Sequence, residues 1–374
     1  MFGITEPSLG TEVARKLSDA RGLIDRHRLA GLVLRSVDDV AWITGGLTNR
    51  IEPGNPVGVA WVVVTPDAAH AITTNVELPR LRAEGGLEAF ELHGVDWFEA
   101  GGFAALAVEL VGAPAARIGG LGADVDDELV ELRLALDEAE QARLSALAAD
   151  ATAALEGAVR QWEPGTRDTD VQARVAAGLE AKGAFGACLI VGGDERVELF
   201  RHPLAAGEPV RRLLMAVVVA ERHGLHAAAT RFASAGPLPD AVRAARGAAA
   251  RVEEAVLDAS RAGATYGEAL TALADAYARA GHARAWRDHY QGGPIGYRQR
   301  EFELAPSQVE SRWYGTAISI GTALAWNPSV AGGGKCEDTY LVEEDGLRRL
   351  TTSEEWPLED GRPAVLDIAS GGPA

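Results

Sequence analysis

The sequence predicts an α/β (α+β) fold built from two successive domains, and three observations carry this prediction. The chain has 374 residues, which is long for one hydrophobic core, since domains average about 150 residues. Hydrophobic residues make up 47% and charged residues 24%, the balance of a globular protein. Strand and helix patterns alternate in the first third, whereas one long helical pattern opens the rest. We therefore expect domains at residues 1–134 and 135–374.

In the first domain, apolar residues at helical spacing predict a helix over residues 11–29. The apolar run Ala30–Arg35 then predicts a buried strand. A second strand is predicted at Val57–Val64, and Ala69–Thr73 follows a Pro-Asp turn closely enough to be its hairpin partner. Strands that alternate with helices are typical of an α/β domain.

The second domain opens with a helical pattern over residues 137–162 that contains one glycine and no proline. Thr166 and Asp168 are candidates for the N-cap of the next helix. Two alanine-rich helices are predicted at residues 241–262 and 266–280. Apolar segments between and after the helices predict strands at Ala187–Val191, Leu213–Glu221, Ala227–Ala233, Thr316–Trp326 and Thr339–Glu343.

Composition limits the partners and the compartment. The formal net charge of −18 repels nucleic-acid phosphates and anionic membranes, so we expect neither as a partner. Cys188 and Cys336 are too few for a disulfide framework or a zinc–thiolate site. Residues 1–17 lack a basic region followed by an apolar one, and the most apolar run, Leu213–Ala220, is far shorter than a membrane span. We therefore expect a cytoplasmic protein.

Polar and ionisable side chains gather at five places in the second domain: Phe200–Pro203, Leu213–Phe232, His289–Glu301, Trp326–Ser329 and Gly334–Thr339. Each place also has a structural interpretation. His202 fits an exposed loop histidine, and Lys335 beside Glu337 fits a buried ion pair. Strand alternation puts His226 and Thr230 on one face of the predicted hairpin. The order of the five places is more informative than any one of them.

That order is His-Pro, a strand hairpin ending in Thr-Arg, a glycine turn with Ile-Gly, a strand ending in Asn-Pro, and Glu-Asp-Thr-x-Leu-Val. It resembles the pita-bread family, which includes methionine aminopeptidase, aminopeptidase P, prolidase and creatinase. The strongest single match is Glu337–Thr351. In the aminopeptidase P, prolidase and creatinase branch, an N-terminal α/β domain precedes the pita-bread domain. The resemblance therefore implies a creatinase-like domain followed by a pita-bread domain, over essentially the whole chain.

The resemblance also implies a metal site with five ligands, which this sequence does not supply. The matching positions are Val217, Ala228, Gly293, Asn327 and Glu337, and only Glu337 is a strong ligand. One carboxylate and one amide oxygen cannot hold a dinuclear site of hard oxygen and imidazole donors. We therefore predict no metal ligands and no cofactor for this site.

Polar residues that remain around the lost ligand positions favour reuse of the pocket. The resemblance to creatinase implies hydrolysis of a small guanidino compound without metal, by a histidine at the position of His202. We predict a metal-independent hydrolase of a C–N bond in a small amide, guanidino or amino-acid-like compound. His202 would be its general acid/base, and Glu337 would assist. The residues predicted to bind the small-molecule substrate are His226, Thr230, Arg231, His289, Tyr290, Gln291, Arg300 and Asn327.

The first domain offers one further candidate, Arg50, in a loop after an apolar stretch. Relatives of the creatinase type are dimers whose N-terminal domain reaches into the partner's pocket. The resemblance therefore implies a homodimer in which Arg50 helps to bind substrate. The plainer interpretation is an exposed loop arginine.

Two other functions stay open. The first is a noncatalytic protein that binds a small ligand or a protein partner in the vacated pocket. The second is an Xaa-Pro peptidase-like metalloenzyme with an unusual ligand set, such as His202, His226, His289 and Glu337.

Overall fold

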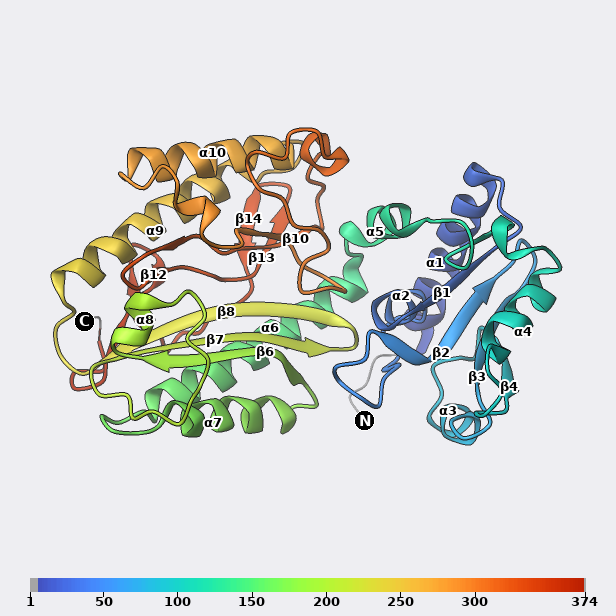
Figure 1. Ribbon diagram of the computed structural model, residues 1–374, viewed down its shortest axis with the longest axis horizontal. Helices are drawn as coiled ribbons and strands as arrows, with labels where there is room; N and C mark the ends of the chain where they lie inside the picture. Colours follow the sequence, from blue (N-terminus) through green and yellow to red (C-terminus); the bar gives the residue numbers. More distant parts are fainter. Residues whose placement is uncertain (1–5, 373–374) are drawn as a thin grey trace. The chain divides into compact units, whose positions relative to one another are not determined.

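The computed structural model describes residues 6–372. Residues 1–5, which belong to the stretch used above to predict that no leader is present, lie outside the described residues. The chain divides into two compact units: one extends to Arg133 and also includes Glu138–Glu140, and the other takes the remaining residues from Leu134 onward. The predicted α/β class is confirmed, since both units combine helices with sheets (Figure 1). Within residues 6–372, no helix is long and apolar enough to cross a membrane.

The first unit is built on a five-stranded sheet with the strand order β4-β3-β2-β1-β5. Its strands are β1 (Gly31–Ser36), β2 (Val57–Val64), β3 (Ala69–Thr74), β4 (Glu91–Val95) and β5 (Ile118–Gly119). The predicted hairpin is present, with β2 and β3 antiparallel, while β3 and β4 run parallel. The helices are α1 (Glu6–His27), α2 (Val37–Ile43), α3 (Leu78–Glu84), α4 (Gly102–Val111) and α5 (Asp126–Leu134). A short 3₁₀ turn, Ala115–Arg117, precedes β5.

Apolar side chains of alternate strand residues hold α4 against this sheet. Val63 and Ile72 are fully buried and pack with Ala107 of α4. The rings of Trp61 and Phe103 meet edge to face at 5.2 Å between centroids. The period-2 pattern of β2 and β3 therefore produces one apolar sheet face, which α4 covers.

The second unit contains two four-stranded sheets between two pairs of helices (Figure 1). One sheet has the order β17-β8-β7-β6 and the other β14-β13-β10-β9. In Figure 1, α6 and α7 lie along one side of the β6–β8 sheet, and α9 and α10 lie beyond the other sheet. The helices are α6 (Glu138–Arg160), α7 (Asp168–Glu180), α8 (Glu195–Leu199), α9 (Asp240–Ala259) and α10 (Tyr266–Arg279). Its strands are β6 (Phe185–Gly193), β7 (Leu213–Arg222), β8 (Leu225–Ser234), β9 (Gly292–Pro294), β10 (Ala323–Trp326), β11 (Ser329–Val330), β12 (Gly334–Lys335), β13 (Tyr340–Glu343), β14 (Gly346–Arg349), β15 (Leu358–Glu359), β16 (Arg362–Pro363) and β17 (Leu366–Asp367).

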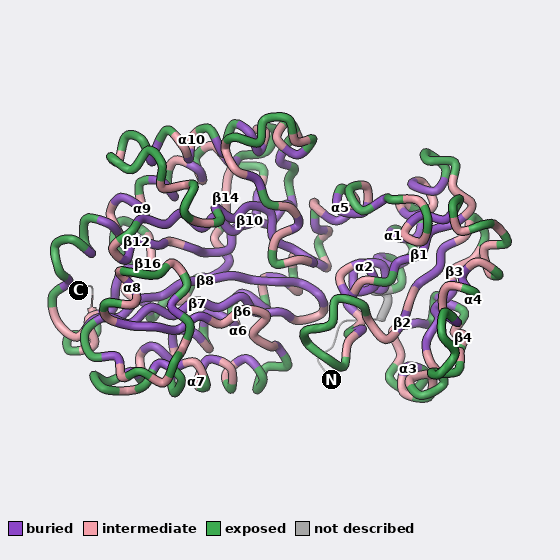
Figure 2. Tube along the Cα trace, viewed as in Figure 1, coloured by how far each residue is buried: buried purple, intermediate pink, exposed green. Residues whose placement is uncertain are grey.

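The hairpin of β7 and β8 lies at the centre of this unit. Every residue of β8 is buried, and so is every residue of β7 except its last (Figure 2). Burial on both faces explains why the sequence of β7 is a continuous apolar run. Thr230 N donates to Glu337 O at 2.9 Å, so β8 also bonds to the segment that leads into β13. The two sheets are therefore joined at the place where the polar residues gather.

Two local predictions are wrong. The N-cap of α7 is Arg167 instead of Thr166 or Asp168, because the Asp168 carboxylate accepts hydrogen bonds from the backbone N–H groups of residues 206–208. The predicted strand Thr316–Trp326 is extended only in its last four residues. Before them, Gly321 adopts a φ of +85°, a left-handed turn conformation that ends any extended stretch there.

Candidate functional site

The residues before β13 alternate between two sides of an extended segment. Glu337 faces Thr230 on β8, and Asp338 faces the opposite side. The hydroxyl group of Thr339 bridges both backbone groups of Ala228, accepting from its N–H at 2.8 Å and donating to its C=O at 2.9 Å. These bonds fix the segment beside β8, so they also fix the direction of both carboxylates.

The Glu337 carboxylate is buried and accepts hydrogen bonds from two side chains. Arg300 Nη2 donates to Oε1 at 2.9 Å, and Thr230 Oγ1 donates to Oε2 at 3.1 Å. Lys335 Nζ lies 3.6 Å from Oε2. Burial alone would raise the pKa of Glu337, but the charges of Lys335 and Arg300 and the two hydrogen bonds outweigh burial and lower it. Glu337 is therefore ionised and paired with cationic groups.

Lys335 supplies the positive charge at this centre. Its ammonium group is buried and donates to Oδ1 of Asn327 while it lies beside Glu337. Burial lowers the pKa of Lys335, and Glu337 partly offsets that effect. Asn327 and Glu337 occupy two of the five positions at which the resemblance implies metal ligands. A cation of the chain itself therefore sits between two of those positions.

The other three positions have no donor atom. Val217 packs in an apolar cluster with Met215 and Phe232, and Ala228 is fully buried. Gly293 has a φ of +145°, and a Cβ atom added there would meet nothing closer than 3.8 Å. Together with the Lys335 contact, these residues do not fit the dinuclear metal site that the fold implies.

A pair of imidazoles lies near this centre. Nε2 of His202 and Nε2 of His289 are 3.2 Å apart, and Nδ1 of His289 lies against the carbonyl oxygen of Tyr290. Burial, Lys335 and His202 together lower the pKa of His289 to about 3, so its ring is neutral at pH 7. Since Nδ1 of His289 must donate to the carbonyl, its Nε2 accepts from His202 Nε2–H. Nδ1 of His202 then carries the free lone pair.

His202 is exposed at the surface, but its surroundings still shift its titration. Partial burial and the charge of Lys335 lower its pKa, while Glu337 acts in the opposite direction. The ring is therefore mostly neutral at pH 7, as a general base requires. His202 and Glu337 do not bond directly, and their coupling is electrostatic.

An open cavity of about 940 Å³ is lined by His289 of the histidine pair. Three predicted substrate-binding residues line it, namely His289, Tyr290 and Gln291, together with Trp286 and Glu303. Tyr290 is 66% exposed. The Gln291 side chain is buried: it accepts from the Tyr277 hydroxyl group and donates to the carbonyl oxygens of Trp286 and His289. Gln291 therefore supports the cavity wall, while His289 and Tyr290 face the open space.

The wall of this cavity depends on a glycine. Gly292 has a φ of +81°, and a Cβ atom there would lie 2.2 Å from the carbonyl oxygen of Ala325. Close pairing of β9 with β10 therefore allows only glycine at this position. The glycine-rich turn is a consequence of strand pairing beside the site.

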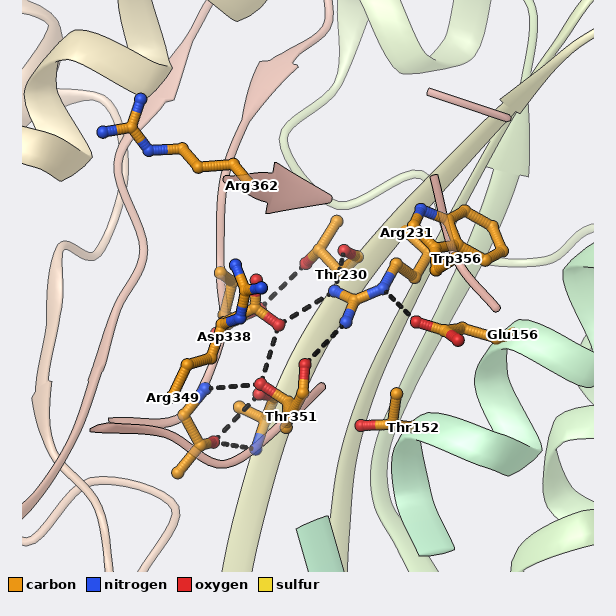
Figure 3. Close-up of polar contacts among 12 residues, drawn as sticks. Thr152, Glu156, Thr230, Arg231, Asp338, Arg349, Thr351, Trp356 and Arg362 are labelled. Carbon is orange, nitrogen blue, oxygen red and sulfur yellow. Dashed lines mark hydrogen bonds and ion pairs between the residues drawn. The ribbon is translucent and has the colours of Figure 1, made fainter. Parts of the chain in front are cut away.

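Arg231, a predicted substrate-binding residue, is enclosed by contacts with the protein itself. Its buried guanidinium donates to Glu156 at 2.8 Å, to Asp338 at 2.9 Å and to the carbonyl oxygens of Thr230 and Thr351 at 2.9 Å (Figure 3). Four of its five N–H groups are therefore taken up by the protein. The side chain lies on the Asp338 side of the segment, away from the face of Glu337, and we assign it a structural role.

Two other candidates are also held by local contacts. The N–H of His226 donates to the carbonyl oxygen of Gly296 at 2.8 Å, and ring atom Nδ1 lies 3.1 Å from the same oxygen. Arg50 belongs to the first unit, where its Nη1 donates to the carbonyl oxygen of Pro53 at 3.3 Å. His226 therefore anchors the glycine turn to β8, and Arg50 contacts its own loop.

The alternative ligand set His202, His226, His289 and Glu337 does not form a cluster of potential ligands in the described part of the chain. Among residues 6–372, the groups of three or more potential ligands within 4.8 Å of one another are His70–Glu91–His93 and Glu12–Asp137–Glu140. Neither group contains a member of the proposed set.

Two features were missed in the sequence. Lys335 and Glu337 are two residues apart in an extended segment, and this period-2 spacing could have indicated that they share a face. The Glu-x-His pattern of Glu91 and His93 in β4 carries the same kind of signal. The sequence predicts Lys335 only as an ion-pair partner, whereas the structure also places it beside Asn327 and Glu337, two of the implied ligand positions.

Comparisons with known proteins find similarity in structure alone. No family model matches the chain, and no curated protein matches its sequence. The solved structure of an Xaa-Pro dipeptidase from Bacillus anthracis has a TM-score of 0.74 at 19% identity, over 91% of this chain and 98% of that chain. Dipeptidase PepE from Mycobacterium ulcerans has a TM-score of 0.74 at 21% identity, over 92% and 96% of the two chains.

An X-Pro aminopeptidase from Thermotoga maritima MSB8 has a TM-score of 0.66 at 17% identity, over 87% of this chain and 96% of that chain. Identities this low establish the fold without establishing the activity. The resemblance seen in the sequence is confirmed at that level. The chain has the pita-bread fold of the prolidases and aminopeptidase P, preceded by the N-terminal domain of that branch.

Proposed function

We propose that the protein is a metal-independent hydrolase of a C–N bond in a small amide, guanidino or amino-acid-like compound. The observation that carries the proposal is the Lys335 ammonium group, bonded to Asn327 and beside Glu337. It places a fixed positive charge between two positions at which the fold implies metal ligands. The structural relatives are named as dipeptidases and aminopeptidases, which hydrolyse C–N bonds, and this supports the coarser class of hydrolase.

His202 is the base in this proposal. Its Nδ1 takes a proton from a water molecule while the water oxygen bonds to the carbon of the substrate. The same nitrogen then returns the proton to the leaving nitrogen as the C–N bond breaks. His289 accepts a hydrogen bond from Nε2 of His202, and this contact sets the tautomer that exposes Nδ1.

Glu337 is a positioning residue in this scheme. Its carboxylate contacts Arg300, Thr230 and Lys335 and makes no hydrogen bond with His202. It therefore stabilises Lys335, whose charge adds to burial in lowering the pKa values of both histidines. The Arg300 side chain is 17% exposed. We assign substrate binding to Arg300, Tyr290 and His289.

The test begins with a thermal-shift screen of small amides, guanidines and amino-acid derivatives, followed by a hydrolysis assay of the compounds that bind. We expect turnover that survives chelation, is abolished by His202→Ala and persists in His282→Ala, an exposed histidine elsewhere in the same unit. Turnover that disappears on chelation would overturn the metal-independent part. Unchanged turnover in His202→Ala would overturn the assignment of the base.

A noncatalytic binding protein is the second candidate, and one observation favours it. Lys335 bonds to Asn327 and pairs with Glu337, as in a structural core, and none of the three side chains lines the cavity beside His289. In this case the screen yields a compound that binds without conversion. Its affinity would then be unchanged in His202→Ala.

The homodimer is part of the proposal as well. Arg50 would serve the partner subunit's site, as the resemblance implies. Light scattering after size-exclusion chromatography measures the assembly, and Arg50→Ala should reduce turnover while the dimer persists. A monomer with full turnover would contradict this arrangement.

A further inference from the structure

Three potential metal ligands meet on two neighbouring strands of the first unit. His70 lies on β3, and Glu91 and His93 lie two residues apart on β4. The strands are parallel, with His70 directly opposite Glu91 in the ladder. Side chains two residues apart on a strand point to the same face, so the pairing brings all three side chains together.

The cluster lies on the face of the sheet that α4 covers. Ile72 and Val95, each two residues further along its strand, pack in the apolar cluster with Ala107 of α4. Strand alternation therefore places His70 and His93 on that same face. β4 is the outermost strand on its side of the sheet, and Figure 2 shows it as partly exposed. His70 is 8% exposed, so the cluster reaches from the core to the sheet edge.

The distances within the cluster approach those of a coordination shell. Nδ1 of His70 lies 3.1 Å from Nε2 of His93. The Glu91 carboxylate oxygens lie 3.4 Å from the His70 atom and 3.9 Å from the His93 atom. Zinc bonds to nitrogen and oxygen of about 2.0–2.2 Å in a tetrahedron separate neighbouring ligand atoms by about 3.3–3.6 Å. The two separations at Nδ1 of His70, 3.1 Å to His93 and 3.4 Å to Oε2 of Glu91, lie near that value, while Oε1 of Glu91 lies further from His93, at 3.9 Å.

A hydrogen-bonded arrangement without an ion explains less of this geometry. Two neutral imidazoles at 3.1 Å share one proton, so one nitrogen donates and the other accepts. When Nδ1 of His70 is the acceptor, it faces a Glu91 oxygen at 3.4 Å and both atoms carry lone pairs; when it is the donor, one proton serves two acceptors. A cation placed among the three atoms satisfies all of their lone pairs at once.

We propose that His70, Glu91 and His93 bind a divalent transition-metal ion of the zinc type. Two imidazoles and one carboxylate form a three-ligand zinc set that leaves a fourth position for water. The ion ties the edge strand β4 to β3. This site lies in the first unit, so it stands or falls independently of the hydrolase proposed for the second unit.

The test is a titration of metal-free full-length protein with Zn²⁺ by isothermal calorimetry, with metal content measured after dialysis. We expect one equivalent per chain in the wild type and a rise in melting temperature with added Zn²⁺. His93→Ala and Glu91→Gln should each weaken binding by more than about tenfold, since even a lost outer-shell partner costs 10–100-fold. Glu91→Gln alters a side chain that is 70% exposed, so it keeps the fold testable if His70→Ala does not fold.

His27→Ala serves as the matched control, because His27 is exposed in the same unit and outside the cluster. It should bind zinc as the wild type does. A wild type without stoichiometric zinc would overturn the proposal. So would zinc binding that persists in Glu91→Gln and His93→Ala but disappears in a His202→Ala/His289→Ala variant, since the ion would then be bound in the second unit.

Discussion

Glu337 and Asp338 are adjacent buried carboxylates that each pair with an arginine, yet their surroundings differ. Asp338 meets Arg231, whose other donors are taken up by Glu156 and two carbonyl groups (Figure 3). Glu337 meets Arg300 and Lys335, and both the carboxylate and the ammonium shift the pKa of His202. On one face of the segment, the ion pair of Asp338 is therefore enclosed by protein. On the other face, the ion pairs of Glu337 are coupled electrostatically to two histidines, one of which lines an open cavity.

The comparison teaches that a buried ion pair alone does not mark a functional site. The Asp338 network also joins buried carboxylates to an arginine and a threonine, and its Arg231 side chain is 1% exposed. What separates the two is the electrostatic coupling of the Glu337 centre to two imidazoles, one of which, His289, lines an open cavity.

The largest expected effect is on the enclosed side. Arg231→Met leaves Asp338 and Glu156 as buried carboxylates without their cation, which should lower the free energy of unfolding by about 3–5 kcal/mol. Chemical denaturation measures the change. Arg348→Ala is the matched control, because its ion pair with Glu343 is exposed and is worth at most about 1 kcal/mol. An Arg231 variant with wild-type stability and lost ligand binding would reverse our assignment.

Lys335→Met tests the other side, with a smaller effect on stability. Asn327 loses its donor but Glu337 keeps Arg300 and Thr230, so we expect a loss of about 1–3 kcal/mol. Removal of the ammonium should also raise the pKa values of His202 and His289, because its charge lowers both.

Titration of the ring protons by NMR measures those two pKa values. The control is Lys182→Met, a lysine with a side chain that is 57% exposed. Histidine pKa values that stay unchanged in Lys335→Met would show that the Glu337 centre and the imidazoles are not coupled.

Sequence reasoning reached the fold because apolar periodicity determines most elements. The run Val57–Val64 forms a strand with the predicted bounds, and the helical pattern at 137–162 became α6. The predicted strand at Thr316–Trp326 failed because its apolar residues give no warning of the turn at Gly321. The apolar pattern predicts whether a segment forms a helix or a strand, whereas the residues at which the element begins and ends depend on local backbone conformation.

The site was less predictable because it depends on the directions of side chains. Thr230 and Arg231 are neighbours in the sequence, but strand alternation sends one toward Glu337 and the other toward Glu156. The buried role of Gln291 depends on Tyr277, 14 residues away, which no local pattern reveals. Residue types identified the region, and only geometry separated supporting residues from those that face the cavity.

A further expected effect is on the dependence of stability on pH. His289 has a pKa of about 3 in the folded protein against about 6.5 when unfolded, so the unfolded chain binds more protons between these values. Stability should therefore fall as the pH drops from about 6.5 toward 3. The lowered pKa of Glu337 adds a further loss below about pH 4.3, its ordinary value.

His289→Gln should make the free energy of unfolding less dependent on pH between 6.5 and 4.5, as measured by denaturation at several pH values. His282→Gln, a change at an exposed histidine, should resemble the wild type. A wild-type protein that gains stability as the pH falls through this range would contradict the neutral histidine pair.

The central claim is that the Lys335 ammonium, and not a metal ion, provides the positive charge at the pita-bread centre. The most direct measurement is the metal content of a Glu91→Gln/His93→Ala variant, in which the site proposed in the first unit is removed. We predict less than about one tenth of an equivalent of transition metal after dialysis, with ligand binding unaffected by chelation. One full equivalent of metal in this double variant would contradict the central claim if the further change Glu337→Gln removed it.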